Sequence, residues 1–333
     1  MEAGNFWMGG VMLNILNLGA GVQSTTVLLK SCLGELPKLD CAIFADTGWE
    51  PKEVYKHLDW LAEFAAGHGV PVHRVSCGRN IRTDAIWAQV RGKKESGNRG
   101  ASMPYYTKAP GDEKEGQIKR QCTSDYKIVP IERFVKKEIL GLSQQARWPK
   151  ELVVRRWYGI SADEAGRIRA PVRTSKKKTG VDLLGQDVYE QVVKPLMWCS
   201  NFYPLIGGIE LFGDVVFGKV GVFDCKKVPG RQSANLPMVK RRDCLDWCKS
   251  HSFPTPPRSA CIGCPYHDDI EWLHLKTSSP DEFEDACQFD DAIRNCGGMC
   301  GQMFLHRSCK PLREIEFSGE HGGGVCESGF CFV

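Results

Sequence analysis

The 333-residue chain contains 16 cysteines, and the spacing of five of them could support metal or sulfur chemistry. Cys261 and Cys264 form a C-x2-C pair among prolines and glycines, in a tight turn that would direct two thiols at one point. Cys244 lies upstream in a C-x16-C-x2-C pattern, and Cys122 or Cys248 could supply a fourth thiol. Four thiolates bind a tetrahedral zinc ion or an iron-sulfur cluster, and spacing alone does not separate the two.

A second pair, Cys326 and Cys331, lies in a glycine-rich C-terminal segment. Cysteines exposed on a flexible segment can act as a nucleophile and a resolving thiol, or can carry a sulfur atom to a second site. An incidental tail fits this pattern equally well. Cys32 and Cys41 lie in apolar segments, and we expect them to be core residues.

Residues 13–29 (LNILNLGAGVQSTTVLL) predict a strand, a glycine-containing turn and a helix that opens near Ser24 and Thr25. Gly19 and Gly21 would let the backbone approach a ligand closely. Unpaired amides at a helix start favour a phosphate or sulfate group. The pattern is neither a Walker loop nor the dinucleotide fingerprint, and a strand-to-helix connection without a ligand would look the same.

Alternating strands and helices would position these residues. Strands are expected at 39–45, 70–75 and 153–160, with a helix that begins near Pro51 between the first two. This order predicts a parallel sheet with ligands beyond the carboxyl ends of its strands. Asp46 falls at such an end, where it would contact a nucleotide or cap a turn.

Several polar segments have less specific patterns. Residues 76–120 are rich in Gly, Lys and Arg, and we expect either a basic lid over the site or a solvated insertion. Lys176–Lys178 is expected in a solvated loop. Ser161 and Glu164 predict a capping box at the start of a short helix. Residues 207–236 are predicted to be a glycine-rich, strand-forming insertion without an assigned role.

Composition and charge narrow the class of protein. A hydrophobic content of 42% suits one elaborated α/β domain, and a net charge of +4 does not by itself indicate a nucleic-acid binder. We expect a nucleotide-binding domain at 1–206 and a Cys-rich region at 237–333 packed on it.

The chain has no apolar run of transmembrane length and no signal peptide, so a cytoplasmic protein without a membrane partner is expected. In that compartment cysteines indicate metal, cluster or redox chemistry. No pattern indicates the oligomeric state.

Six motifs in this order resemble the PP-loop superfamily, on the branch of phosphoadenosine phosphosulfate (PAPS) reductases and their phage- and plasmid-encoded relatives. The motifs are LGAGVQST, ADTGWEP, QCTSDYKIVPI, GISADEAGRIR, YPLI and SACIGCPYH. The resemblance covers residues 13–75, 118–170, 203–206 and 237–333. It implies an α/β, adenine nucleotide alpha hydrolase-like fold with insertions and an enzyme of sulfur metabolism.

The resemblance also implies roles for particular residues. The residues that would bind the nucleotide are Gly19, Gly21, Gln23, Ser24, Thr25, Asp46, Thr47 and Arg167, and Lys127 would steady anionic groups beside them. Cys122, Cys261 and Cys264 resemble the arrangement that holds a 4Fe-4S cluster, and Cys244 would complete it. Two departures are notable. Gln121 precedes a single Cys122 where cluster-bearing members have paired cysteines, and Gln23 stands where ATP-cleaving members usually carry Asp.

The first function that the resemblance implies is the reduction of a sulfonucleotide such as PAPS to sulfite. A thiolate, Cys326 or Cys331, would attack the sulfate sulfur, and the nucleotide phosphate would leave with Lys127 and the loop amides stabilising its charge. A thioredoxin-like reductant would then release sulfite and restore the thiol.

Two alternatives stay open. In the first, the protein is an ATP pyrophosphatase, with or without magnesium, that adenylates DNA or tRNA. A cluster-bound sulfur, or a persulfide sulfur from a cysteine desulfurase, would then displace AMP. The basic segments favour this alternative, because phosphate contacts give sequence-independent affinity. In the second, the protein is a non-catalytic, zinc-stabilised module that binds a nucleotide.

Overall fold

The computed structural model describes residues 12–91, 103–109, 115–181, 186–213, 231–232, 236–295 and 301–317. The chain forms two compact units, each built from three separate segments. The first unit comprises Met1–Ile43, Leu61–His73 and Val135–Pro256. The second comprises Phe44–Trp60, Arg74–Phe134 and Pro257–Val333.

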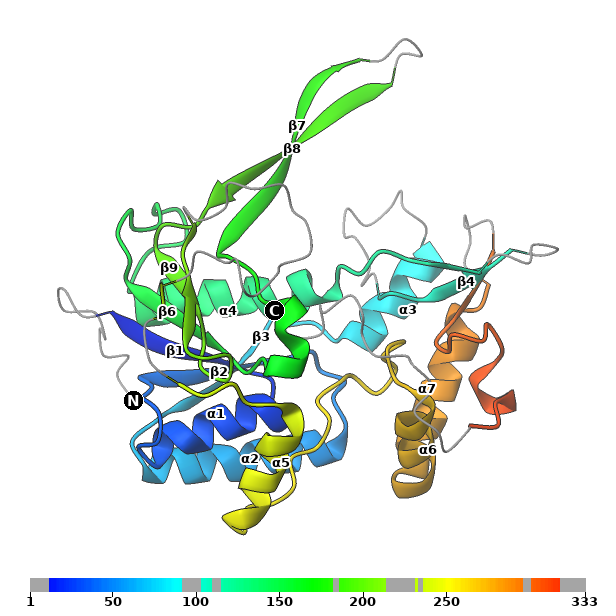
Figure 1. Ribbon diagram of the computed structural model, residues 1–333. Helices are drawn as coiled ribbons and strands as arrows, with labels where there is room; N and C mark the ends of the chain where they lie inside the picture. The colour runs from blue at the N-terminus through cyan, green and yellow to red at the C-terminus, as the bar shows by residue number, and fades with distance from the viewer. Residues whose placement is uncertain are drawn as a thin grey trace. The chain divides into compact units, whose positions relative to one another are not determined.

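The first unit is built on parallel strands. β1 (Leu13–Leu18), β6 (Val154–Tyr158) and β9 (Cys199–Tyr203) run parallel as neighbours, and β10 (Ile209–Leu211) continues antiparallel to β9. They belong to a seven-stranded sheet of the described residues in the order β11-β10-β9-β6-β1-β2-β3 (Figure 1). The short β11 spans Arg231–Gln232. This confirms the predicted α/β class with a mostly parallel sheet.

The chain passes between the units within β2 (Cys41–Asp46), α2 (Lys52–Gly67) and β3 (Val72–Ser76). The predicted strands agree with β2, β3 and β6 to within two residues. α2 follows Pro51 as expected, buries Val54, Leu58 and Leu61 at helical spacing, and is followed by Gly69 at a φ of 70°. These elements therefore form where the local sequence pattern is strongest.

The first unit also contains helices and short helical turns. α1 (Val22–Cys32) begins two residues before the expected position and packs against α5 (Arg241–Ser250). The 3-10 helix η3 (Ala162–Arg167) follows β6, and the π-helical turn η2 (Val135–Ile139) lies before it in the chain. No helix among the described residues is long and apolar enough to cross a membrane.

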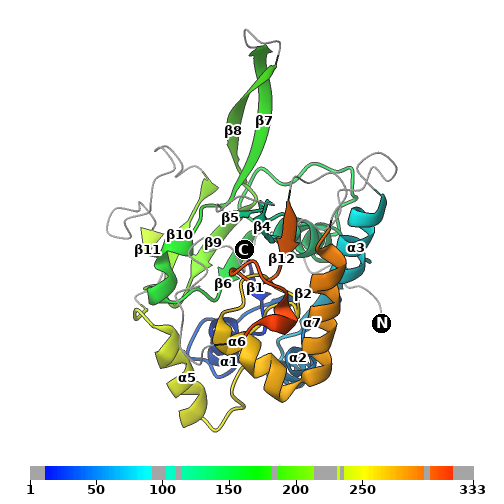
Figure 2. The same cartoon turned by 90° about the vertical axis from the view of Figure 1, so that its right-hand side faces the viewer.

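A two-stranded ribbon, β7 (Val172–Val181) and β8 (Asp187–Pro195), forms a sheet of its own among the described residues. Figures 1 and 2 both show it as a long twisted hairpin. The predicted solvated loop at Lys176–Lys178 is therefore wrong, since these residues pair with Gln191, Glu190 and Tyr189. β8 is rich in β-branched and aromatic residues, which favour a strand, and β7 pairs with it. The lysine run alone gives no sign of this partner strand.

The second unit combines a small antiparallel sheet with helices. Its sheet has the order β12-β4-β5, from β12 (Gln302–Phe304), β4 (Tyr106–Lys108) and β5 (Glu115–Gln117). The helices are α3 (Ile81–Arg91), α6 (Asp269–Ser278) and α7 (Pro280–Ile293), with the 3-10 turn η5 (Leu312–Glu314). The π-helical turn η1 (Ser124–Ile128) leads into α4 (Val129–Phe134). Their shared core includes Trp49, Trp272 and Phe289.

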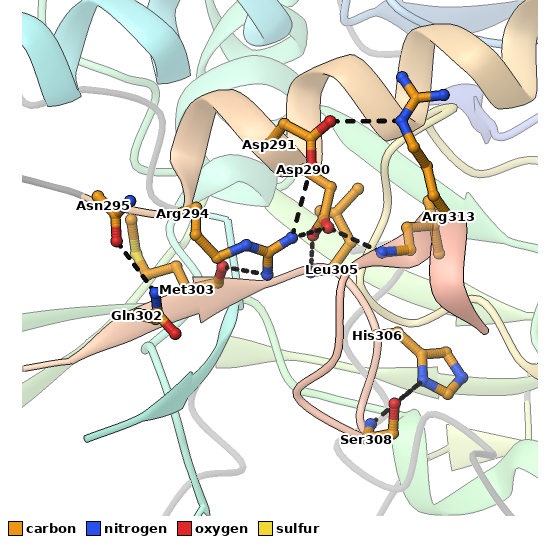
Figure 3. A network of polar contacts seen from close by, with 11 residues as sticks. Asp290, Asp291, Arg294, Asn295, Gln302, Met303, Leu305, His306, Ser308 and Arg313 are labelled. Carbon is orange, nitrogen blue, oxygen red and sulfur yellow. Dashed lines mark hydrogen bonds and ion pairs between the residues drawn. The ribbon is translucent and has the colours of Figure 1, made fainter. Parts of the chain in front are cut away.

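A buried carboxylate ties the last described segment to α7 (Figure 3). Asp290 is fully buried, accepts the N–H groups of Leu305 at 2.8 Å and Leu312 at 3.0 Å, and forms an ion pair with Arg294. Arg294 donates in turn to the carbonyl of Met303 at 3.0 Å. One charged pair thus satisfies the backbone of a segment that is otherwise poor in secondary structure.

Parts of the predicted lid and insertion lie outside the described residues. Of 76–120, the structure describes α3, β4, β5 and their immediate flanks, and of 207–236 it describes β10 and β11 with adjoining residues. The predicted domain limits at 206 and 237 stay predictions.

Candidate functional site

The turn between β1 and α1 presents backbone donors without a side-chain cap. Ala20 has a φ of 57°, in the left-handed region, and Gly21 precedes α1 with no side chain to accept its first amides. The Ser24 hydroxyl accepts the Gly19 N–H at 3.2 Å and donates to the Gly21 carbonyl at 3.3 Å, which closes the turn. The first turn of α1 carries no acidic residue. Such a helix start suits an anion, and anion binding at this turn stays a prediction.

Gly159, directly after β6, passes very close to this turn. A Cβ atom at Gly159 would lie 2.5 Å from the backbone nitrogen of Ser24 and 2.8 Å from the carbonyl carbon of Gln23. No side chain fits there, so glycine is required for the segment after β6 to lie against the start of α1. Sequence reasoning did not single out Gly159, although it is the first residue of the GISADEAGRIR motif.

Gln23, predicted to bind the nucleotide, is buried and held by protein partners. Its amide nitrogen donates to the Ser161 hydroxyl at 3.3 Å and to the Glu164 carboxylate at 3.0 Å. Its amide oxygen lies 3.4 Å from a guanidinium nitrogen of Arg241 on α5. Arg167 forms an ion pair with Glu164 at 2.7 Å. Gln23 therefore joins α1 to η3 and α5.

The predicted capping box at Ser161 and Glu164 is wrong. Ser161 precedes η3 but its side chain makes no capping hydrogen bond, and Glu164 has non-helical backbone angles. Both side chains instead receive the amide of Gln23. Gln23, which is 138 residues away in the chain, bonds to Ser161 in place of the local cap. Local sequence patterns do not predict such distant partners.

Asp46 and Thr47, at the end of β2, belong to the second unit. Asp46 accepts the Gly48 N–H at 2.7 Å and the Tyr55 hydroxyl at 2.8 Å, so its carboxylate shapes the turn. Thr25 lies buried inside α1 in the first unit. Of the predicted nucleotide-binding residues, the structure therefore brings Gly19, Gly21, Gln23, Ser24, Thr25 and Arg167 together in the first unit.

A buried polar group surrounds Cys261 in the second unit. The Thr47 hydroxyl donates to a Glu50 carboxylate oxygen at 3.0 Å and lies 3.3 Å from the Cys261 sulfur. The Cys261 thiol donates to the same Glu50 oxygen at 3.7 Å, and the Lys127 ammonium lies 3.7 Å from it. The second Glu50 oxygen has no hydrogen-bond partner, although the side chain is fully buried. Sequence reasoning assigned no role to Glu50, although it lies in the ADTGWEP motif after the apolar strand β2.

The C-x2-C pair forms the tight turn that the sequence predicted. The Cys264 N–H donates to the Cys261 carbonyl at 3.0 Å, and the Ile262 N–H donates to the Trp49 carbonyl at 2.9 Å. Gly263 lies against the Trp49 ring, because a Cβ there would come within 2.2 Å of it. The His267 Nε2–H donates to the Cys261 carbonyl at 3.0 Å. Burial, followed by the nearby Arg258 charge, lowers the pKa of His267 to about 4, so the ring is neutral at pH 7.

Cys122, Cys261 and Cys264 lie in one region of the second unit and have electrostatically linked thiols. Burial, together with a smaller contribution from the Cys122 thiol, raises the pKa of Cys264 to about 11. Burial and then Glu50 raise the pKa of Cys261 well above its usual range, and burial also raises the pKa of Cys122. Lys127 lowers the pKa of all three. The thiols are therefore protonated at pH 7, and a bound metal would have to displace those protons.

This donor set fits an iron-sulfur cluster chemically, since it combines three shielded thiols with a cation that offsets their charge. The described residues contain no group of three or more His, Cys, Asp or Glu side chains arranged to hold a metal ion. A single zinc ion needs all its thiolates about 2.3 Å from one atom, whereas the thiolates of a four-iron cluster bind different irons.

Cys244 and Cys248 are buried on α5 in the first unit, where the Thr26 hydroxyl lies 3.6 Å from the Cys248 sulfur. Burial raises the pKa of Cys244 to about 12. Cys326 and Cys331, the predicted nucleophiles, lie outside the described residues.

Comparisons with known proteins add nothing to the resemblance to the PP-loop superfamily, which depends on the sequence motifs alone. No model of a known protein family matches the chain, and no curated protein matches it.

Proposed function

We propose that this protein is a PP-loop enzyme of sulfur metabolism that binds an adenine sulfonucleotide at the β1–α1 turn and reduces it to sulfite. The observation that carries the proposal is the group of thiols at Cys122, Cys261 and Cys264, of which Cys261 is buried and the other two are partly buried, with Lys127 beside them. Thiols with raised pKa values are poor nucleophiles but good metal ligands once deprotonated. They support a resident cluster, with the reacting thiol supplied elsewhere in the chain.

In the proposed reaction a thiolate, Cys326 or Cys331, attacks the sulfate sulfur. A sulfur–sulfur bond forms, the sulfur–oxygen bond to the nucleotide breaks, and the nucleotide phosphate leaves with the electron pair. A dithiol reductant such as a thioredoxin then attacks the protein sulfur, releases sulfite and becomes a disulfide after a second thiol exchange. The amides of the β1–α1 turn would hold the nucleotide's anionic groups.

Cys122, Cys261 and Cys264 would hold a 4Fe-4S cluster. Such a cluster would supply electrostatic polarisation and redox capacity beside Lys127. Lys127 offsets the negative charge that three thiolates would bring into the interior, and the nearby guanidinium of Arg258 also lowers the pKa of Cys264.

The amide at position 23 favours a sulfonucleotide over ATP as the substrate. Gln23 carries no charge, and its two amide atoms face Ser161, Glu164 and Arg241. A carboxylate that would ligate magnesium for ATP cleavage is absent from this position.

The first test is the metal content of protein purified without oxygen. Wild type should contain about four irons and four sulfides per chain, and the C261A/C264A variant should contain almost none. C244A/C248A is the matched control, since it also removes two buried thiols. Retained iron in this control would show that Cys244 is not a ligand, and one zinc without iron in wild type would contradict the cluster.

The second test is the reaction itself. Wild type with PAPS and a dithiol reductant should produce sulfite, and the C326S and C331S variants should identify the nucleophile. Sulfite formation at the parental rate in both variants would refute this assignment, and no sulfite in wild type with a full cluster would refute the reaction.

A second candidate is ATP-dependent insertion of sulfur into a nucleic acid. The specific observation in its favour is the run of basic residues on β7, Arg173 and Lys176–Lys178. Pyrophosphate released from ATP only when DNA or tRNA is present would support it. ATP turnover that is indifferent to nucleic acid would count against it.

A further inference from the structure

A serine, a histidine and an aspartate form a chain of hydrogen bonds in the second unit. The Ser308 hydroxyl lies 2.8 Å from Nδ1 of His306 (Figure 3), and Nε2 of His306 lies 3.2 Å from a carboxylate oxygen of Asp269. His306 and Asp269 are buried, whereas Ser308 is partly exposed. The three residues lie outside the six sequence motifs, and neither proposed reaction uses them. A hydroxyl at the accessible end of such a chain can act as a nucleophile.

The contacts of His306 decide which ring nitrogen carries its proton. The backbone N–H of Ser308 donates to Nδ1 at 3.2 Å, so Nδ1 is an acceptor. Nε2 then carries the proton and donates it to the Asp269 carboxylate. Burial lowers the pKa of His306, although Asp269 opposes this effect, so the ring is neutral at pH 7. The unprotonated nitrogen therefore faces the serine hydroxyl, as a general base must.

The backbone around the serine is fixed from both sides. Asp290 accepts the N–H of Leu305, directly before His306, and the N–H of Leu312 beyond the serine (Figure 3). Cys309, directly after the serine, has a φ of 50°, and its N–H donates to the His306 carbonyl at 3.1 Å. Residues other than glycine rarely adopt this left-handed conformation. The turn is therefore held in an uncommon conformation that brings the hydroxyl and the ring together.

The charge beside the serine favours an ester as the substrate. Asp269 is the first residue of α6, where the helix dipole stabilises its carboxylate. Arg307, next to Ser308 in the chain, donates to Asp269 at 2.9 Å, and 38% of its side chain is exposed. The attack of a serine on an ester carbonyl creates one negative charge on the carbonyl oxygen. A guanidinium next to the nucleophile suits that charge.

Two further serine–histidine pairs among the described residues lack this support. The Ser278 hydroxyl lies 3.2 Å from Nδ1 of His274, and the Ser250 hydroxyl lies 3.1 Å from Nδ1 of His251. Both histidines are exposed, and the carboxylates that face their Nε2 atoms lie 3.6 and 3.7 Å away, beyond hydrogen-bonding distance. Proximity to a histidine alone therefore does not distinguish Ser308, whereas the buried and hydrogen-bonded carboxylate does. The exposed pairs provide matched controls.

We propose that Ser308 and His306, oriented by Asp269, form a hydrolytic centre for small carboxylic esters. His306 takes the proton of the Ser308 hydroxyl while the serine oxygen bonds to the ester carbonyl carbon. The carbon–oxygen bond to the alcohol breaks, and the alcohol leaves with the electron pair and the proton from His306. Water, deprotonated by the same ring, then releases the carboxylic acid and restores the serine. The inference goes beyond the proposed function, because it needs neither a nucleotide nor a cluster.

The test uses full-length protein purified without oxygen and a fluorophosphonate, a reagent that phosphonylates activated serines. Wild type should take up the label, and peptide mass spectrometry should locate it on Ser308. In S308A the label should be lost, and the hydrolysis of p-nitrophenyl butyrate should fall at least about 100-fold. S278A is the matched control and should match the wild type within about twofold. Wild type without label on Ser308, or S308A that hydrolyses the ester at the parental rate, would overturn the proposal.

D269N tests whether Asp269 positions the ring. An amide at this position can donate to Nε2, which moves the ring proton to Nδ1, so Nδ1 can no longer accept from Ser308. We expect the rate of labelling to fall at least about 100-fold while the thermal unfolding midpoint shows a folded protein. The ¹⁵N shifts of the His306 ring, identified by their absence in H306Q, should report the exchanged tautomer. Labelling at the parental rate, or unchanged ring shifts, would refute the role of Asp269.

Discussion

The β1–α1 turn and the cysteine region would hold their ligands by opposite means. The turn offers backbone amides, and its geometry depends on the absence of a side chain at Gly159. The cysteine region offers side chains, and its chemistry depends on which of them are ionised beside Glu50 and Lys127. A backbone amide keeps its proton at every physiological pH, whereas a buried thiol must lose one to bind a metal. The turn should therefore be sensitive to added atoms and the cysteine region to charge.

The largest expected effect concerns the charged pair that supports the second unit. In D290N, Arg294 loses its buried carboxylate partner and keeps only Asp291 at 3.9 Å as an ion pair. An amide group also cannot accept from both the Leu305 and Leu312 N–H groups as the two carboxylate oxygens do. We expect the free energy of unfolding to fall by about 3–5 kcal/mol, measured by urea denaturation.

D291N is the matched control, because the neighbouring Asp291 side chain is 53% exposed and lies 3.4 Å from Arg313. D291N should lower the free energy of unfolding by less than about 1 kcal/mol. Equal losses of unfolding free energy in the two variants would show that the buried carboxylate of Asp290 contributes no more to stability than the exposed carboxylate of Asp291.

The next effect tests the turn by adding a single methyl group. In G159A the new Cβ would meet the Ser24 backbone, so the turn must shift. We expect the dissociation constants for PAPS and ATP to rise at least about 100-fold, or ~2.7 kcal/mol, in equilibrium binding.

G166A is the control, since a Cβ at Gly166 meets nothing within 4 Å. Its affinity should stay within about twofold of wild type. Wild-type affinity in G159A would show that the nucleotide does not bind at this turn.

A smaller effect concerns acid stability. Burial lowers the pKa of His57 to about 4, below the unfolded value of 6.5. As the pH falls from about 6.5 towards 4, the unfolded chain takes up a proton that the folded chain does not, so stability is lost. The H57F variant should lack this loss, which amounts to about 2 kcal/mol at pH 5.

The measurement compares the urea unfolding of wild type and H57F at pH 7.5 and 5. The difference between the two proteins should change with pH in favour of H57F. A difference that is independent of pH would mean that His57 titrates alike in the folded and unfolded chains.

The smallest effects separate the two charges beside Cys261. Glu50 raises the pKa of this thiol and Lys127 lowers it. In metal-free protein, E50Q should shift the alkylation of Cys261 to lower pH, and K127M should shift it to higher pH. Peptide mass spectrometry resolves Cys261 from the other thiols. Shifts of the same sign would contradict the arrangement.

The sequence was most informative where a function depends on local backbone. β1, the helix after Pro51 and the C-x2-C turn were all predictable, because proline, glycine and apolar periodicity act over a few residues. The turn after β1 was also predicted, although its left-handed residue is Ala20 and not a glycine. α1 began at Val22 rather than near Ser24, whose hydroxyl bonds back to the Gly19 N–H and the Gly21 carbonyl.

Long-range partners were not predictable in the same way. Glu50 meets Cys261 across 211 residues, and Gln23 meets Glu164 across 141. The lysine run on β7 forms a strand because it pairs with β8. The close approach of Gly159 to Ser24 leaves no pattern in the residues next to either position. The fold class therefore followed from the pattern, whereas the polar partners of the site required tertiary structure.

The path of the chain has a consequence for synthesis. The chain passes between the two units five times, and the second unit includes Pro257–Val333. A ribosome therefore releases the residues that complete the second unit last, after most of the first unit has emerged. More than a third of the chain is translated between Cys122 and Cys261. Any factor that delivers a metal to these cysteines together with Cys264 would therefore act on a nearly finished chain. Neither unit can be obtained by truncating the gene at one position.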